Sequence, residues 1–190
     1  MIDAAINHIA SELNQQLMRT YRLSEDVVVV ANILEQDGSV SPHVENKIIV
    51  SLVNIEKESV AFRQQNVASV GSTRSIVTSP PVHFNLYIMI TSCFSGKNYQ
   101  EGLKFISKTI SFFQSQNNFD QQNSPGLDIN IEKLILDIEN LNISDLSNLW
   151  GILSGKYLPS VLYKVRMVTF DSNSVKKQTP RLSQQEATIG

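Results

Sequence analysis

Apolar residues recur at three- and four-residue intervals near the start of the chain. Such spacing places them on one side of a helix, and it predicts an amphipathic helix over roughly residues 2–21. Asp3 falls in its first turn and Arg19 in its last, as the helix dipole favours. The residues that form the apolar stripe are Ile2, Ile6, Ile9, Leu13 and Leu17.

Later segments rich in β-branched and apolar residues predict the strands of a sheet. Residues 27–30 are a short buried run, and residues 47–58 begin apolar and end charged. Residues 82–91 alternate apolar and polar side chains, which is typical of a half-buried strand. A final strand is expected at 161–170. Residues 129–141 fit either a strand or a helix, and the face shared by Leu134, Leu136 and Ile138 favours the strand.

Two further helices are expected between these strands. One covers about residues 99–114, and its predicted inner stripe is Leu103, Ile106, Ile110 and Phe113. The other follows Ser144, which we interpret as its N-cap, and ends at Gly155. Residues 115–126 are expected to form a polar loop. This order of elements predicts a mixed α+β fold with a largely antiparallel sheet and helices packed on one face.

Two polar segments stand apart from the periodic pattern. Residues 59–80 lie between two predicted strands and are too long for a tight hairpin turn, so we expect a projecting arm or loop. Residues 172–190 are polar and lack periodicity, which favours a flexible C-terminal tail. The predicted domain therefore spans residues 1–171 and carries the arm within it.

Composition and charge exclude several classes of partner. The chain has 190 residues and a net charge of -2, which argues against a protein that binds nucleic acid or a membrane mainly through basic patches. One cysteine, Cys93, cannot form an internal disulfide, which is typical of synthesis in a reducing compartment. The first residues do not resemble a signal peptide, and no apolar run approaches the length of a membrane span. We therefore expect a protein made in the cytoplasm.

The histidines do not form a metal site in the sequence. His8, His43 and His83 fall on different predicted elements, and none has a second ligand at helical or strand spacing. The segment Gly71–Ser75 lacks the lysine and the spacing of a phosphate-binding loop. We expect no cofactor and no bound metal.

Two carboxylate pairs are candidate catalytic groups. Glu56 with Glu58, and Asp137 with Glu139, would each lie about 6.6 Å apart on one strand face, a spacing that alone suits a glycosidase. Both pairs lie near the ends of predicted strands, where solvated charges are ordinary. Because no nucleophile, base and orienting group come together, we expect no enzymatic activity.

Three segments form a pattern in their order and spacing. The first is the strand that follows Pro80 and Pro81, and the second is the helix at 99–114. The third and most specific segment contains Leu149, Trp150, Tyr157, Pro159, Ser160 and Tyr163. In this order, the three segments resemble the terminator, or cap, family of extracellular contractile injection systems, of the antifeeding prophage and Photorhabdus virulence cassette type. The resemblance covers roughly residues 2–171.

The resemblance implies a fold similar to phage tail terminators and a structural role. Six copies would form a homohexameric ring that ends the inner tube and the sheath and fixes the length of the particle. The implied partners are other copies of the chain, the tube protein and the sheath protein, within a particle released from the cell. The alternative is another assembly component of the same kind of particle, either an adaptor or a baseplate protein.

The arm and the tail carry the contacts that we expect to serve assembly. Basic side chains there suit acidic residues on a neighbour, and the tail suits addition as a strand to the sheet edge of a sheath subunit. A solvated loop and a simple frayed end are the alternatives. The expected interface residues are Arg63, Gln64, Gln65, Arg74, Lys176, Lys177 and Arg181.

Overall fold

A computed structural model describes residues 1–34, 41–58, 74–78, 83–153, 157–169 and 175–180. The helices are α1 (Ile2–Tyr21), α2 (Tyr99–Ser115) and α3 (Ile143–Ile152), with the short 3-10 helices η1 (Pro42–Val44) and η2 (Gly96–Asn98). The strands are β1 (Val28–Val30), β2 (Lys47–Lys57), β3 (Arg74–Thr78), β4 (His83–Cys93), β5 (Asn118–Asp120), β6 (Ile131–Glu139), β7 (Ser160–Thr169) and β8 (Val175–Pro180). The predicted helices and strands of the domain are confirmed within a few residues at each end.

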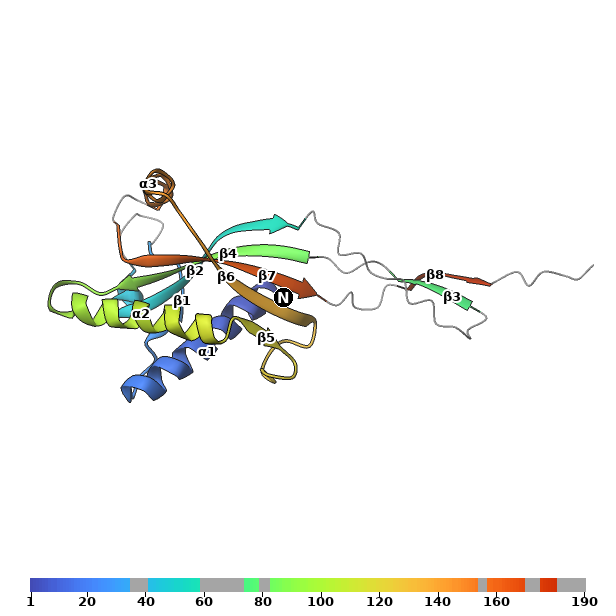
Figure 1. Cartoon of the computed structure of the whole chain (residues 1–190), viewed down its shortest axis with the longest axis horizontal. Helices are drawn as coiled ribbons and strands as arrows, with labels where there is room; N and C mark the ends of the chain where they lie inside the picture. Colours follow the sequence, from blue (N-terminus) through green and yellow to red (C-terminus); the bar gives the residue numbers. More distant parts are fainter. Residues whose placement is uncertain (35–40, 59–73, 79–82, 154–156, 170–174, 181–190) are drawn as a thin grey trace, which may run out of the picture.

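Six of the strands form one sheet, in the order β1-β2-β4-β7-β6-β5 (Figure 1). β1 pairs with β2 in parallel, and every other pairing in this sheet is antiparallel. The expected mixed and largely antiparallel sheet is confirmed. We call this sheet with its three helices the body.

The main core lies between the sheet and the helices α1 and α2, which cover the same face. Ala5, Ile9, Leu13 and Leu17 of α1 are fully buried there, as their spacing predicts. The alternating positions of the strands supply the other half of this core. These strand residues are Ile48 and Val50 of β2, Leu86, Ile88 and Ile90 of β4, and Tyr163 and Val165 of β7.

Helix α2 is rotated relative to the predicted stripe. Phe113 is buried as expected, but Leu103 is 39% exposed, and Phe105 lies in the core in its place. The cause is Gly102, which lies against β4. A Cβ atom there would come 2.3 Å from Ser92 Oγ and 2.8 Å from Phe94 Cβ, so a glycine lets this face of the helix approach the strand. The predicted stripe considered only apolar side chains, so it did not include the contact at Gly102.

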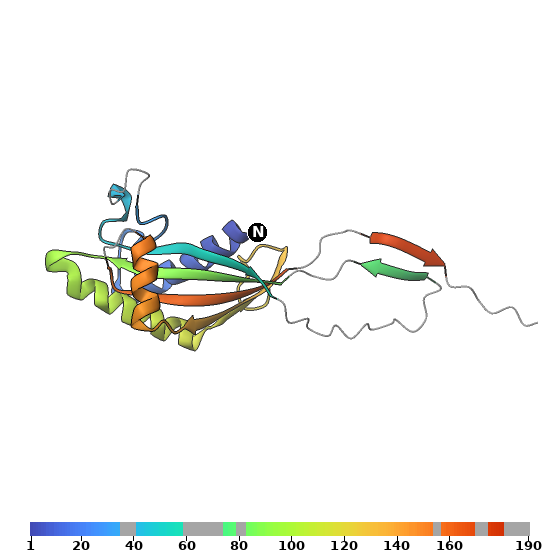
Figure 2. The same ribbon diagram turned by 90° about the horizontal axis from the view of Figure 1, so that it is seen from above.

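Helix α3 covers the face of the sheet opposite to α1 and α2 (Figures 1 and 2). The expectation that all helices pack on one face is therefore wrong for α3. Trp150 is its most buried residue, 3% exposed, and packs with Ile49, Met89 and Leu162 of the central strands. Along the strands, these side chains alternate with those of the main core, so they point to the other face of the sheet. The sheet therefore buries residues on both faces at this end and needs a helix on each.

Two local assignments were wrong. The N-cap of α3 is Asn142, whose Oδ1 accepts a hydrogen bond from the Asp145 N–H at 2.9 Å, and not Ser144. The expected polar loop at 115–126 contains the strand β5, because Phe119 is fully buried within it. Gly155, the expected end of α3, lies outside the described residues.

The strands β3 and β8 form a separate antiparallel two-stranded sheet, which we call the ribbon. Ile76 is paired with Gln178, and Val77 with Lys177. The ribbon lies beyond one end of the body, on the side where β2 and β7 end (Figures 1 and 2). It joins one segment from the predicted arm to one from the predicted tail, two regions that the sequence analysis had treated separately.

Candidate assembly interface

The buried cluster around His8 comes closest to a catalytic arrangement. His8 Nε2 lies 2.7 Å from Ser124 Oγ, and the Ser124 hydroxyl donates to Glu12 Oε1 at 3.2 Å. Burial lowers the pKa of His8, an effect opposed by the nearby charge of Glu12. Ser124 is only 2% exposed, and the imidazole packs edge-on against Phe119. A substrate has no access to this serine, so the cluster fastens α1 to the segment after β5.

The two carboxylate pairs lie on the sheet as ordinary surface charges. Glu56 Oε2 accepts a hydrogen bond from the Tyr87 hydroxyl at 3.0 Å. Asp137 forms an ion pair with Arg166 at 3.0 Å, and both side chains are well exposed. One carboxylate of each pair thus contacts a side chain on a neighbouring strand.

The described residues contain no candidate metal site and no candidate membrane span. Within the described ranges, no group of three or more His, Cys, Asp or Glu side chains is placed to hold a metal ion. None of the three helices is long and apolar enough to cross a membrane. Two surface hollows of about 300 and 440 Å³ lie beside α1 and α2. The surfaces that the fold leaves open are the remaining candidates for an interface.

The ribbon brings together three of the seven predicted interface residues. Arg74 begins β3, and its Cα partner on β8 is Pro180. Lys176 and Lys177 lie on β8 itself. Two segments about a hundred residues apart in sequence therefore present their basic residues on one projecting sheet. The other predicted interface residues, Arg63, Gln64, Gln65 and Arg181, lie outside the described residues.

The motif around Trp150 positions α3 and starts β7. The Trp150 ring contacts the exposed Tyr157 ring edge-on, with 5.6 Å between centroids. The carbonyl of Pro159 accepts a hydrogen bond from Ser92 N–H at 2.9 Å, and Ser160 then pairs with Thr91 of β4. Leu149 is a half-buried member of the α3 core. Pro80 and Pro81 lie outside the described residues.

Tyr163 ends this motif in the main core. Its ring packs on Phe113, and burial raises the pKa of its hydroxyl to about 12. Its hydroxyl has no hydrogen-bond partner in the described part of the chain. Trp150 and Tyr163 are therefore packing residues, which hold α3 and α2 against the two faces of the sheet.

The outer edge of β2 is a further open surface, which was not expected from the sequence. β2 has eleven residues, but β1 pairs with only three of them, Ile48–Val50. The remainder of β2, from Ser51 to Lys57, has no strand on its outer side among the described residues. The change from apolar to charged residues along this strand was the available signal, and it indicates where the edge becomes exposed.

Comparison with known proteins gives the family of this fold. The model of the Pvc16 N-terminal domain family matches residues 4–184. One similar solved structure is the sheath/tube terminator of PVC, an extracellular contractile injection system, in its extended state. It is 15% identical with a TM-score of 0.56, over 96% of this chain and 62% of that one. No curated protein sequence matches the chain.

A second solved structure supports the same fold. It is the tube-terminating cap of the anti-feeding prophage, 15% identical with a TM-score of 0.50, over 94% of this chain and 61% of that one. The chain thus spans less than two thirds of the length of either solved protein. The terminator-like fold expected from the sequence is confirmed. Because the family model covers nearly the whole sequence, the chain belongs to the Pvc16 N-terminal domain family.

Proposed function

We propose that this chain is a non-catalytic subunit of the cap that ends the tube and sheath of a contractile injection particle. One observation carries the proposal: 96% of the chain shares its fold with a protein named as a sheath/tube terminator. Membership of the Pvc16 N-terminal domain family supports it. Six copies form a ring, and this ring binds the last layer of tube and sheath and fixes particle length.

The physical requirements of a cap agree with the surfaces of this chain. A growing tube adds rings because each ring offers the interface for the next, so a cap must match one end and offer no copy of that interface. A ring of identical subunits closes through heterologous contacts between two different surfaces of each copy. The ribbon and the open edge of β2 are two such surfaces, and neither needs a catalytic group.

The partners in this proposal are other copies of the chain, the tube protein and the sheath protein. Nucleic acid and membranes have no part in it, in keeping with the net charge of -2. The protein is made in the cytoplasm and leaves the cell as part of the particle.

Particle length tests the proposal directly. Particles assembled without this protein and imaged by negative-stain microscopy are expected to have abnormal and widely spread tube or sheath lengths. Adding the full chain back restores a single length. Normal lengths in its absence would contradict a cap, and few or no particles would instead indicate an adaptor or baseplate component.

A further inference from the structure

The outer edge of β2 has backbone groups that are ready to pair with another strand. Glu58 N–H bonds to the carbonyl of His83 on β4, so the alternate residues Glu56 and Asn54 also face β4. Ile55 and Lys57, which lie between them, direct their N–H and C=O groups away from β4. Beyond β1 this edge meets no strand among the described residues.

The side chains along this edge are also incompletely covered. Leu52 and Ile55 are 39% and 44% exposed, although β2 is apolar and buried at its other end. Glu56 is exposed, and its carboxylate has no cation partner within the described ranges. The edge thus combines unpaired backbone, exposed aliphatic surface and negative charge. Exposed edges of this kind accept strands from other chains.

The ribbon is also incomplete, because it consists of only two strands. A sheet of two strands is marginally stable in water unless a third strand or a helix packs against it. Residues 74–78 and 175–180 contain Arg74, Lys176 and Lys177 and no acidic residue. An additional strand would complete the ribbon, and acidic side chains on that strand would match its charge.

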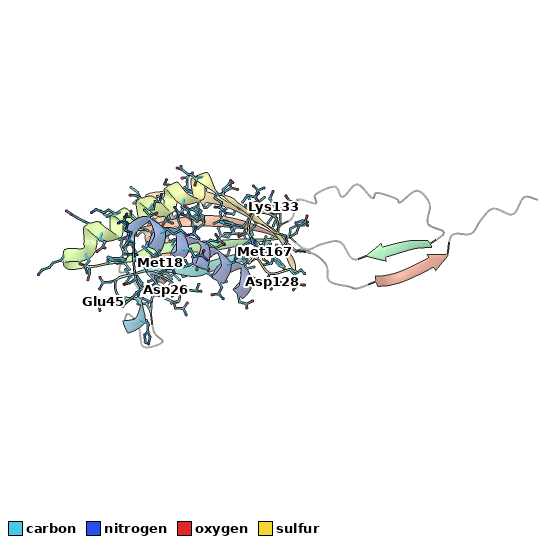
Figure 3. The ribbon with its side chains drawn as sticks, turned by 90° about the horizontal axis from the view of Figure 1, so that it is seen from below. Met18, Asp26, Glu45, Asp128, Lys133 and Met167 are labelled. Atoms are coloured by element: carbon cyan, nitrogen blue, oxygen red, sulfur yellow. The ribbon has the colours of Figure 1, made fainter. Side chains whose placement is uncertain are left out.

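The two surfaces belong to two separate sheets within one copy. Lys133 and Met167 mark the end of the body nearest the ribbon, and Asp26 and Glu45 lie at the far end (Figure 3). The ribbon extends beyond the body on the near side, where β2 also ends, and neither of its strands pairs with β2 (Figure 2). Each surface is therefore available to a different molecule.

We infer that the ribbon of one copy adds to the free edge of β2 in a second copy. The contact joins two different surfaces, so its repetition produces a closed ring or an open chain of copies. Backbone hydrogen bonds supply affinity, and the basic ribbon meets Glu56 and Glu58 beside the edge. This inference deepens the proposed function and rests on it for the closure of the ring, but the contact itself can be tested separately.

Cross-linking between isotopically distinct copies tests the contact. Full-length protein labelled with ¹⁵N is mixed with unlabelled protein, unfolded and refolded together, and treated with a carbodiimide, which joins a carboxylate directly to an amine. Mass spectrometry is expected to find Glu56 or Glu58 joined to Lys176 or Lys177, with one heavy and one light peptide. If these links are absent, or occur only within single copies, the inference is wrong.

Proline at Ile55 tests the backbone contribution. Ile55→Pro removes an N–H that faces the free edge and leaves the bonds to β4 in place, whereas Ile55→Ala removes apolar area and keeps the N–H. We expect Ile55→Pro to weaken self-association at least about tenfold relative to Ile55→Ala, measured by sedimentation, with the melting temperature as the control for folding. Equal association of two folded variants would overturn the inference.

A charge exchange covers the case in which Ile55→Pro does not fold. Glu56→Lys is expected to weaken association about threefold per contact, and adding Lys177→Glu to the same chain is expected to restore it. A chain that stays monomeric at every concentration, or a double variant weaker than both single variants, would contradict the contact. Particle lengths report separately on the proposed function, because the cross-links form in the isolated protein.

Discussion

The imidazole of His8 on α1 lies 2.7 Å from the hydroxyl of Ser124, a residue 116 positions later in the chain. This contact connects the first helix to the segment after β5 through a buried hydrogen bond. Since both residues are nearly inaccessible to water, neither can exchange this partner for solvent at low cost.

Removing the hydroxyl should destabilise the body. Ser124→Ala leaves His8 Nε2 buried without a partner, and we expect the free energy of unfolding to fall by about 1–3 kcal/mol. Urea denaturation followed by circular dichroism measures the change. Ser107→Ala is the matched control, because the Ser107 hydroxyl is exposed and bonds only to its own helix. An equal loss in both variants would contradict the role of Ser124.

The stability of the body should fall at low pH because of His8. Burial lowers the pKa of His8 in the folded state below its ordinary value, about 6.5, so the unfolded chain takes up the proton first. The contribution of neutral His8 is therefore complete above that value and is lost as the pH falls below it. Unfolding curves at pH 7.5 and 5.5 are expected to differ less in His8→Gln than in the original protein. The same pH dependence in both would rule out His8 as its source.

Gly102 and Gly151 should respond oppositely to alanine. A Cβ at Gly102 would overlap β4, so Gly102→Ala is expected to cost about 1–3 kcal/mol despite the better helix propensity of alanine. A Cβ at Gly151 on α3 meets nothing within 4 Å, so Gly151→Ala is expected to stabilise by up to about 1 kcal/mol. Thermal unfolding of the two variants checks the difference. Equal shifts would show that α2 does not approach β4 as closely as described.

The cap of α3 can be tested in the same way. Asn142→Ala removes the bond to Asp145 N–H and should cost about 1 kcal/mol, whereas Ser144→Ala should change little. Chemical denaturation of both variants measures the difference. A larger effect at Ser144 would restore the assignment that the sequence suggested.

Deleting residues 62–76 tests the ribbon in the particle. The deletion removes most of β3 and no strand of the six-stranded sheet, so the body should keep its melting temperature. We expect ring formation and capping to be lost, measured by mass and by particle length. Normal particle lengths with this variant would count against any role of the arm in assembly.

Local sequence signals were sufficient to predict most of the body. The stripe of α1 and the alternation in β4 arise from side chains that face one core, so their spacing carries the information. The orientation of α2 was not predictable in this way, because it depends on the absence of a side chain at Gly102. The place of α3 depends on which face of the sheet Met89 and Leu162 occupy, which requires the strand order.

The ribbon that contains three of the proposed interface residues was not predicted from the sequence. Arg74, Lys176 and Lys177 were selected for charge and for their position in polar segments. Their association in one ribbon depends on a pairing across about a hundred residues, and short polar strands leave no periodic signal for it. The open edge of β2 follows from the length of its neighbour, β1, which no property of β2 alone reveals.

The long separation of β3 and β8 also sets an order of events during synthesis. The ribosome must finish residue 180 before β3 has a partner, whereas the last strand of the body is complete at residue 169. A nascent chain therefore contains every strand of its body before it contains both strands of the ribbon. If the ribbon is needed for assembly, copies without residues 175–180 cannot take part in it.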